Sequence, residues 1–153
     1  MPSKLLKDYL NKEHVKYVSI QHSPAYTAQE VAESAHVPGR DLAKTVVIKV
    51  EGKMAMFVLP ANRKVVLPEL REELGKIKIT LATEDEFKGR FPDCEIGAMP
   101  PFGNLYGMDV FVAPSLTQET EIAFNAGTHT EAIKMAYADF ARLVQPKVLD
   151  FTT

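Results

Sequence analysis

The spacing of hydrophobic residues predicts a helix, a strand and a second helix within the first forty positions. Residues 3–13 place apolar side chains at helical spacing, and the serine at their start can cap the helix. The β-branched and aromatic residues over 16–22 favour a strand. Thr27 and Glu30 have the pattern of a capping box, so we expect a helix over 27–37 that the following proline and glycine end.

Two apolar, β-branched segments in the middle of the chain predict a hairpin. Residues 44–50 and 53–60 flank a short turn at 51–52, which can join only antiparallel neighbours. A proline at its start and a glycine at its end mark a helix over 68–75, and a strand is expected over 76–82. The same reasoning predicts a helix capped by Thr83 over 83–91, strands over 109–113, 121–126 and 130–136, and a helix over 138–144.

Strands and helices are interleaved in this pattern, yet several pairs of strands are joined by short turns. Such turns require antiparallel neighbours, whereas a doubly wound parallel sheet needs a crossover after each strand. We therefore expect an α/β (α+β) fold in which helices surround a mixed, largely antiparallel central sheet. No repeat, low-complexity segment or linker interrupts the chain, so residues 1–153 are predicted to form a single domain.

The composition is that of an ordinary soluble domain and excludes several classes of protein. Hydrophobic residues make up 46% of the chain and charged residues 25%. Cys94 is the only cysteine, so an internal disulfide is impossible, and without a basic neighbour its thiol is expected to be inert. No apolar run approaches the roughly 18 residues that cross a membrane, and the charged first residues are unlike a signal peptide. We expect a cytoplasmic protein.

The formal net charge of −2 argues against a protein that grips long nucleic acid such as DNA, because that requires a basic footprint. It leaves room for contact with the end of a nucleic acid. Local basic positions exist, among them Arg63 and Lys64, and most are interpreted as solvated surface side chains.

Two stretches place polar groups at the end of a strand. Lys44 begins a largely apolar strand, so its ammonium group can point into a cleft and hold an anionic or carbonyl oxygen; an exposed lysine is the alternative. In FNAGTHT, residues 124–130, three hydrogen-bonding side chains follow a glycine bend. His129 there can act as an acid, a base or a steric gate, although an ordinary polar turn has the same pattern.

The segment GAMPPFGNLYG, residues 97–107, is too rich in glycine and proline for a helix or a regular strand. Adjacent prolines fix the backbone and glycines permit unusual angles, so we expect a rigid loop lined by Met99 and Phe102; a stiff connector is the plainer interpretation. The usual phosphate loops, the G-x-S-x-G elbow and metal-ligand spacings among the four histidines are absent. We expect neither a metal nor another cofactor.

Taken together, DLAKTVVIKV, IGAMPPFGNLYGMDVFV and FNAGTHTEAIKM, in this order and at these distances, resemble the YbaK/prolyl-tRNA editing-domain family. The resemblance covers nearly the whole chain, including YVSIQHSPAYTAQEVA near its start. It implies an aminoacyl-tRNA deacylase, which hydrolyses the ester between a tRNA and a wrong amino acid, such as alanine or cysteine on proline tRNA. Because the chain has no room for a synthetase, it resembles the free-standing members that edit in trans.

The resemblance also implies roles for particular residues. Lys44 matches the family's lysine that positions the aminoacyl ester or the tRNA 3′ end, and His129 matches a histidine that in some relatives selects the amino acid by size. These two are the expected catalytic residues. The segments that match or flank the walls of the amino-acid pocket supply the expected substrate-binding residues, which are His22, Tyr26, Thr45, Gly97, Met99, Pro100, Pro101, Phe102, Gly103, Asn125, Gly127 and Thr128.

The chain departs from better-known free-standing members at 99–101, where they carry glycine-serine-proline, and at Ala132, where they carry an aspartate. The expected chemistry is attack by a placed water, with Lys44 and backbone amides holding the ester and the substrate's ribose hydroxyl assisting. The expected partners are the 3′ acceptor end of an aminoacyl-tRNA and an aminoacyl-tRNA synthetase. Two alternatives stay open: a non-catalytic tRNA- or aminoacyl-binding module acting as a translation adaptor, and an esterase for small acyl esters.

Overall fold

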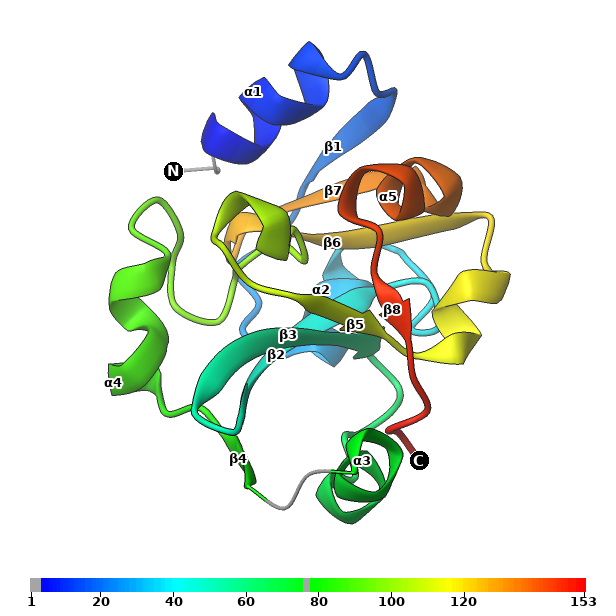
Figure 1. Cartoon of the computed structure of the whole chain (residues 1–153). Helices are drawn as coiled ribbons and strands as arrows, with labels where there is room; N and C mark the ends of the chain where they lie inside the picture. Colours follow the sequence, from blue (N-terminus) through cyan, green and yellow to red (C-terminus); the bar gives the residue numbers. More distant parts are fainter. Residues whose placement is uncertain (1–3, 76–77) are drawn as a thin grey trace.

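The computed structural model describes residues 4–75 and 78–153, which form two β-sheets with helices packed against them (Figure 1). In chain order the elements are α1 (Lys4–Lys12), β1 (Tyr17–Gln21), α2 (Ala28–Ser34), β2 (Ala43–Val50), β3 (Lys53–Pro60), α3 (Leu67–Leu74), β4 (Ile79–Leu81), α4 (Glu84–Phe87), β5 (Val110–Val112), β6 (Glu121–Thr128), β7 (Glu131–Ala136), α5 (Tyr137–Val144) and β8 (Lys147–Val148). Short 3-10 turns span Lys88–Arg90, Gly103–Leu105 and Pro114–Gln118. The cap predicted at Ser3 and the predicted strand residues 76 and 77 lie outside the described residues.

The strands divide between a three-stranded sheet, in the order β1-β7-β6, and a five-stranded sheet, in the order β4-β2-β3-β5-β8. The pairs β3–β5 and β5–β8 are parallel and the other pairs are antiparallel. The expected α+β class with largely antiparallel strands is therefore confirmed, but the strands form two sheets instead of one. Because β4 pairs only with residues 48–50 of β2, the other end of β2 is free to approach β6, and a parallel bridge joins Leu42 to Ala123.

The unbroken apolar run in β3 is explained by burial on both faces of that strand. Met56 and Val58 belong to the main core between the sheets, while Phe57 and Leu59 belong to a second core beside α3. This alternation follows from the two-residue period of a strand. Figure 1 shows α1 and α5 beside the small sheet and α3 at the opposite end of the molecule.

The glycine-proline loop is part of the main core. All of its residues from Ala98 to Gly103 are buried. The ring of Phe102 is fully buried, with its centroid 5.4 Å from that of Phe124 in β6 and 5.5 Å from that of Phe140 in α5. The loop therefore fastens the small sheet and its helices to the rest of the chain.

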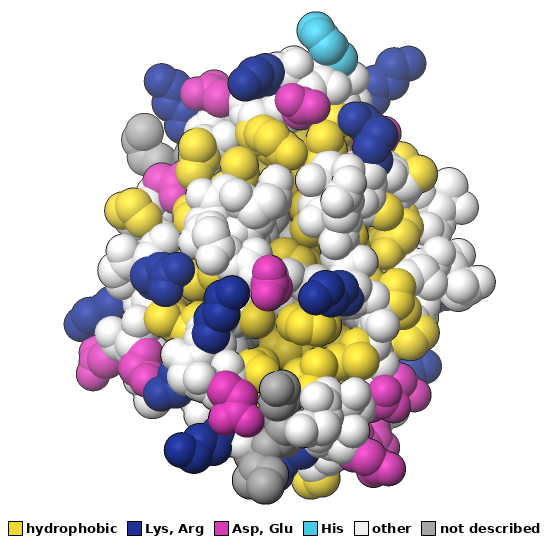
Figure 2. Space-filling view, viewed as in Figure 1, with side chains coloured by type: hydrophobic (Ala, Val, Ile, Leu, Met, Phe, Trp, Pro, Cys, Tyr) yellow, Lys and Arg dark blue, Asp and Glu magenta, His cyan; other side chains and the backbone are white. Residues whose placement is uncertain are grey.

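Basic and acidic side chains are interspersed on the face of the molecule that Figure 2 shows, and no stripe of one sign crosses its described residues. This face therefore carries no basic footprint for a long nucleic acid. In the part of the chain that the structure describes, no helix combines the length and the apolar character that a membrane span requires.

Candidate active site

Lys44 in β2 and Asn125 in β6 lie two residues beyond the bridge that joins Leu42 to Ala123. Side chains two positions apart leave the same face of a strand, so both start from the face on which Leu42 and Ala123 pack with Val31 of α2. The Oδ1 atom of Asn125 is buried and has no hydrogen-bond partner among the described residues. Adjoining stretches of the two sheets thus present an ammonium group and an unpaired amide oxygen on the side of α2.

A cavity of about 250 Å³ opens beside Lys44, between the start of α2 and the segment that follows β3. Its lining residues are Thr27, Ala28, Gln29, Lys44, Ala61, Asn62, Arg63 and Lys64. This cationic cavity has three basic residues and no carboxylate in its lining. Burial lowers the pKa of Lys44, and the positive charge of Lys64 lowers it further. Such an arrangement favours an anionic group.

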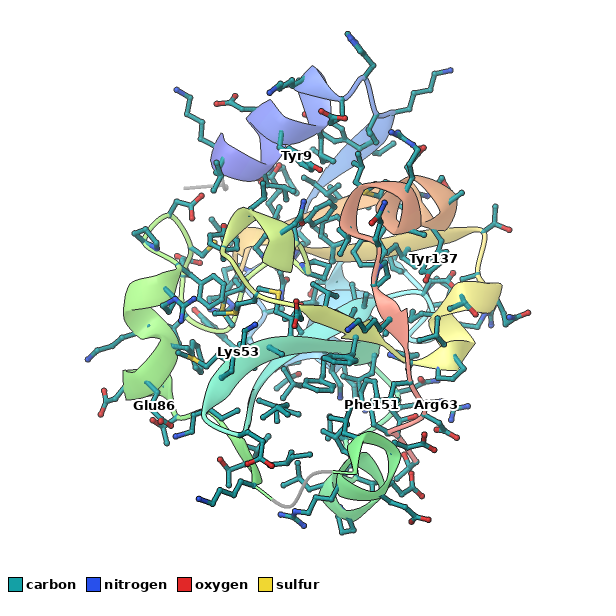
Figure 3. All side chains as sticks on the ribbon, in the orientation of Figure 1. Tyr9, Lys53, Arg63, Glu86, Tyr137 and Phe151 are labelled. Atoms are coloured by element: carbon teal, nitrogen blue, oxygen red, sulfur yellow. The ribbon has the colours of Figure 1, made fainter. Side chains whose placement is uncertain are left out.

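Arg63 and Lys64 are exposed, as the sequence suggested, but contacts made by the end of the chain help to hold them at the cavity. The guanidinium group of Arg63, labelled in Figure 3, donates to the Thr153 carbonyl oxygen at 2.5 Å. The Lys64 N–H donates to the Thr153 Oγ1 atom at 3.4 Å. Sequence reasoning missed these two residues as site components because Thr153 lies 90 residues beyond Arg63.

A β-bulge in the β6–β7 hairpin connects the hairpin to the glycine-proline loop. The pairing register shifts between Asn125 and Thr128, and Gly127 has a φ of 94°, in the region that favours glycine. The Gly127 N–H donates to the Ala98 carbonyl oxygen at 2.9 Å, and its own carbonyl accepts from the Glu95 N–H at 2.7 Å. The bulge thus turns two backbone groups toward residues 95–98.

His129 lies in the two-residue turn of this hairpin, and its backbone N–H and its ring contact residues from two other segments. Its backbone N–H donates to the Glu95 Oε1 atom at 2.7 Å, and its ring Nε2 lies 2.9 Å from the Ile96 carbonyl oxygen. The Tyr26 ring lies against the imidazole, with 4.7 Å between the centroids. Since a carbonyl oxygen only accepts, Nε2 carries the proton. In the neutral imidazole the Nδ1 atom then carries the lone pair, and this atom is buried with no partner among the described residues.

The segment before α2 packs against the same turn. The His22 N–H donates to the Thr130 carbonyl oxygen at 2.8 Å, and the Ala25 N–H donates to the His129 carbonyl oxygen at 3.0 Å. The Nδ1 atom of His22 donates to the Ser23 carbonyl oxygen at 2.8 Å, and its Nε2 atom is buried without a partner in the described part of the chain. His22 and His129 therefore both carry an unpaired ring nitrogen near one hairpin.

Other residues predicted to bind substrate lie elsewhere. Phe102 is fully buried and Met99 is 6% exposed, because large apolar side chains are stabilised by packing between the sheets. Both side chains thus pack in the main core, and their expected place at the wall of the amino-acid pocket stays a prediction. A Cβ atom on Gly103 would lie 2.6 Å from the Met108 carbonyl oxygen, so Gly103 serves close packing. Thr45 leaves the face of β2 opposite to that of Lys44.

The remaining predicted residues divide between the core and the hairpin. Pro100 and Pro101 are buried, whereas Gly97 is exposed and lies beside His129, where an added Cβ would be 3.6 Å from Cε1. Thr128 is buried, and its Oγ1 lies 3.3 Å from the hydroxyl of the next threonine in the turn. Among residues 4–75 and 78–153, no three His, Cys, Asp or Glu side chains gather in a way that could hold a metal ion.

The two-sheet fold has a solved counterpart in a candidate trans-editing enzyme for prolyl tRNA synthetase. The two structures agree with a TM-score of 0.83 over 99% of this chain and 96% of that protein. At 19% sequence identity the similarity shows a shared fold.

Two curated relatives define the class of protein. The multifunctional Ser/Thr-tRNA deacylase ProXp-y of Escherichia coli is 28% identical over 150 residues, which cover 93% of this chain and 87% of the relative. The prolyl-tRNA editing protein ProX of Acetoanaerobium sticklandii is 23% identical over 143 residues, which cover 89% and 86%. The expected class, a hydrolase of the aminoacyl-tRNA deacylase type, is confirmed. The aminoacyl-tRNA editing domain profile matches residues 22–143, and the chain belongs to that family.

Proposed function

We propose that this protein is a single-domain, cytoplasmic deacylase that acts in trans on small amino acids attached to tRNA, with Lys44 and His129 at the reacting ester. The observation that carries the proposal is the position of Tyr26 and Thr27. Thr27 lines the cationic cavity, and its neighbour Tyr26 contacts the His129 ring. One substrate can therefore place its anionic backbone in the cavity and its aminoacyl group at the hairpin.

The cationic cavity fits a phosphate near the 3′ end of tRNA. Arg63 and Lys64 supply charge at its rim, and Lys44 supplies a half-buried ammonium group beside them. Arginine and lysine are the usual partners of phosphate oxygens. A net charge of −2 accords with a grip limited to the end of the tRNA.

The reaction requires a water oxygen to attack the carbonyl carbon and the ester C–O bond to break. The proton from water passes to the departing ribose oxygen, so the products are the free amino acid and the tRNA. The Lys44 ammonium is suited to stabilising the negative charge that develops on the carbonyl oxygen. We assign the unpaired His129 Nδ1 atom as the group that accepts a proton or a hydrogen bond.

Small amino acids are favoured because His129 and Gly97 lie close together. Gly97 presents no side chain to the imidazole, and the neighbouring residues Ala98 and Met99 are buried. The curated relatives are named for seryl-, threonyl- and prolyl-tRNA, so the panel of substrates must include several small side chains. Whether a synthetase partner is needed is a matter for the same assay.

The test is a deacylation panel with Ala-, Cys-, Ser-, Thr- and Pro-tRNA. Lys44→Ala is expected to lower kcat/KM at least a hundredfold on the accepted substrate. Lys53→Ala is the matched control, because Lys53 is 73% exposed at the far end of the same hairpin. Arg63→Gln and Lys64→Gln should each reduce the salt dependence of tRNA binding, by about 0.7 in the log–log slope. If His129→Ala keeps full turnover and changes only the amino-acid preference, His129 acts as a steric gate and not as a base.

Other results would lead to different functions. No turnover on any aminoacyl-tRNA, with tRNA binding retained, would indicate a binding module that serves as a translation adaptor. Turnover that does not depend on the tRNA body would indicate an esterase for small acyl esters.

A further inference from the structure

Glu95 joins the glycine-proline loop to the β6–β7 hairpin through its backbone and its side chain. Its N–H donates to the Gly127 carbonyl oxygen at 2.7 Å, and its carbonyl accepts from the Ala98 N–H at 3.0 Å. Its Oε1 atom accepts from the backbone N–H of His129 at 2.7 Å. One residue thus contacts the loop, the bulge and the turn.

These contacts hold the backbone on both sides of the His129 ring. On one side the N–H of His129 is bonded to a carboxylate, and such charge-assisted bonds are among the stronger ones in proteins. On the other side the Nε2–H of the ring is bonded to the carbonyl of Ile96, the residue that directly follows Glu95. The distance between that carbonyl and the turn therefore depends on the contact made by the Glu95 side chain.

We propose that Glu95 is a positioning residue, which, together with the Ile96 carbonyl, holds the neutral His129 ring as the Nε2–H tautomer and leaves the Nδ1 lone pair without a partner in the protein. The effect on catalysis rests on the proposed deacylase function, whereas the effect on the tautomer does not. In this arrangement the Glu95 side chain acts as a hydrogen-bond acceptor and does not touch the substrate. Its amide analogue should therefore replace it.

Long-range ¹H–¹⁵N spectra of the free protein, labelled with ¹⁵N-histidine, test the structural half. His129→Gln identifies the signals of the ring. In the unmodified protein we expect one His129 species, with a protonated Nε2 and an unprotonated Nδ1. Glu95→Ala should convert this into a mixture of tautomers, and Glu95→Gln should preserve it. Glu73→Ala is the matched control, because Glu73 is an exposed glutamate of α3.

Deacylation kinetics test the other half. Glu95→Ala should lower kcat/KM on the accepted aminoacyl-tRNA about tenfold, as expected for loss of one hydrogen bond. Glu95→Gln should restore most of it, and the Kd for uncharged tRNA should not change. In a His129→Ala background, Glu95→Ala should have no further effect.

Two results would overturn the proposal. One is a single unchanged tautomer in Glu95→Ala. The other is a Glu95→Gln variant as impaired as Glu95→Ala, which would mean that Glu95 acts through its charge. If no aminoacyl-tRNA is hydrolysed but the tautomer still responds to Glu95→Ala, the deacylase function fails and the positioning of His129 stands.

Discussion

The Tyr26 ring lies against the imidazole of His129, with ring centroids 4.7 Å apart and planes inclined by 46°. Tyr26 is nevertheless 70% exposed. A large exposed aromatic side chain loses few packing contacts when it moves, and it gains contact area when a ligand binds. Tyr26 therefore covers His129 on its solvent side, and a ligand that approaches from that side contacts Tyr26 first.

Removal of this cover should weaken the selection of amino acids by size. We expect Tyr26→Ala to lower the ratio of kcat/KM between the accepted amino acid and a larger one about fivefold, since an aromatic contact contributes about 0.5–1.5 kcal/mol. Tyr26→Phe retains the ring and should behave as the unmodified protein. The measurement is competitive deacylation of paired aminoacyl-tRNAs. Equal effects of the two variants would assign the role to the hydroxyl group and not to the ring.

The lowered pKa of Lys44 predicts a defined dependence on pH. Between that pKa and the ordinary value of 10.5, folded Lys44 binds fewer protons than the unfolded chain, so the free energy of unfolding rises with pH across this window. The ammonium group loses its charge across the same window, so we expect the affinity of the cavity for anions to fall there. Lys64→Met removes one cause of the shift and should raise the pKa of Lys44 toward 10.5. A ¹³C-lysine NMR titration measures it.

Lys53→Met is the control for the titration, since Lys53 lies at the other end of the β2–β3 hairpin. It should leave the pKa of Lys44 unchanged. An unchanged pKa in Lys64→Met as well would show that burial alone causes the shift. The charge of Lys64 would then have no effect on the pKa of Lys44.

Gly97 and Gly89 form a matched pair for testing backbone strain beside His129. Gly97 has a φ of 86°, whereas Gly89 has an ordinary φ and nothing within 4 Å of an added Cβ. Gly97→Ala should lower the free energy of unfolding by about 1–2 kcal/mol, because side chains disfavour the left-handed region. Gly89→Ala should be neutral or slightly stabilising. Urea unfolding measures both, and equal values would mean that the loop relaxes without cost.

Local patterns were sufficient to predict most elements of this fold. The β2–β3 hairpin follows from two apolar runs about a two-residue turn, and Glu51 and Gly52 both have positive φ, at 51° and 84°. The capping box predicted at Thr27 is present. The division into two sheets was not predicted, because it depends on which distant strands pair. β8 was not predicted for the same reason, since it has two residues and pairs only with β5.

The candidate site was predicted where the chemistry is local and missed where it depends on distant contacts. Lys44 and His129 stand at the ends of regular strands, which sequence patterns reveal. Glu95 contacts a residue 34 positions away, and nothing in its neighbourhood distinguishes it from a surface glutamate. The surroundings of Phe102 could not be predicted, because an apolar loop residue has the same pattern whether it faces the core or a ligand.

Glu131 in β7 is 1% exposed, and its ion pair with Lys7 of α1, at 2.7 Å, attaches that helix to the small sheet. Ser19 also donates to this carboxylate, while the Oε1 atom of Glu131 has no partner among the described residues. Lys7→Ala should lower the free energy of unfolding by about 2 kcal/mol or more, because it leaves a buried charge without its partner. Lys12→Ala, which changes an exposed lysine of the same helix, should cost far less.

The comparison is made by urea unfolding at neutral pH. In the Glu131→Gln background the charge is absent, so Lys7→Ala should lose most of its effect. A full effect in that background would mean that the lysine stem, and not the ion pair, holds α1 in place.

Met99 allows a separate test of whether the buried loop controls the size of the amino acid. Met99→Ala should lower the free energy of unfolding by about 2–4 kcal/mol, the usual cost of truncating a buried methionine. Met99 is two positions from Gly97, which lies beside the His129 ring, so the space left by truncation should also admit larger amino acids. The measurement is the deacylation panel extended to larger side chains.

Met108→Ala is the matched control for this prediction. Met108 is 5% exposed, belongs to the same core as Met99 and follows the other end of the loop. Its truncation should cost similar stability without changing the substrate profile. If both variants broaden the profile equally, general loosening of the core is the cause. If neither does, the loop acts only as a scaffold for Glu95 and His129, and selection belongs to Tyr26 and the imidazole.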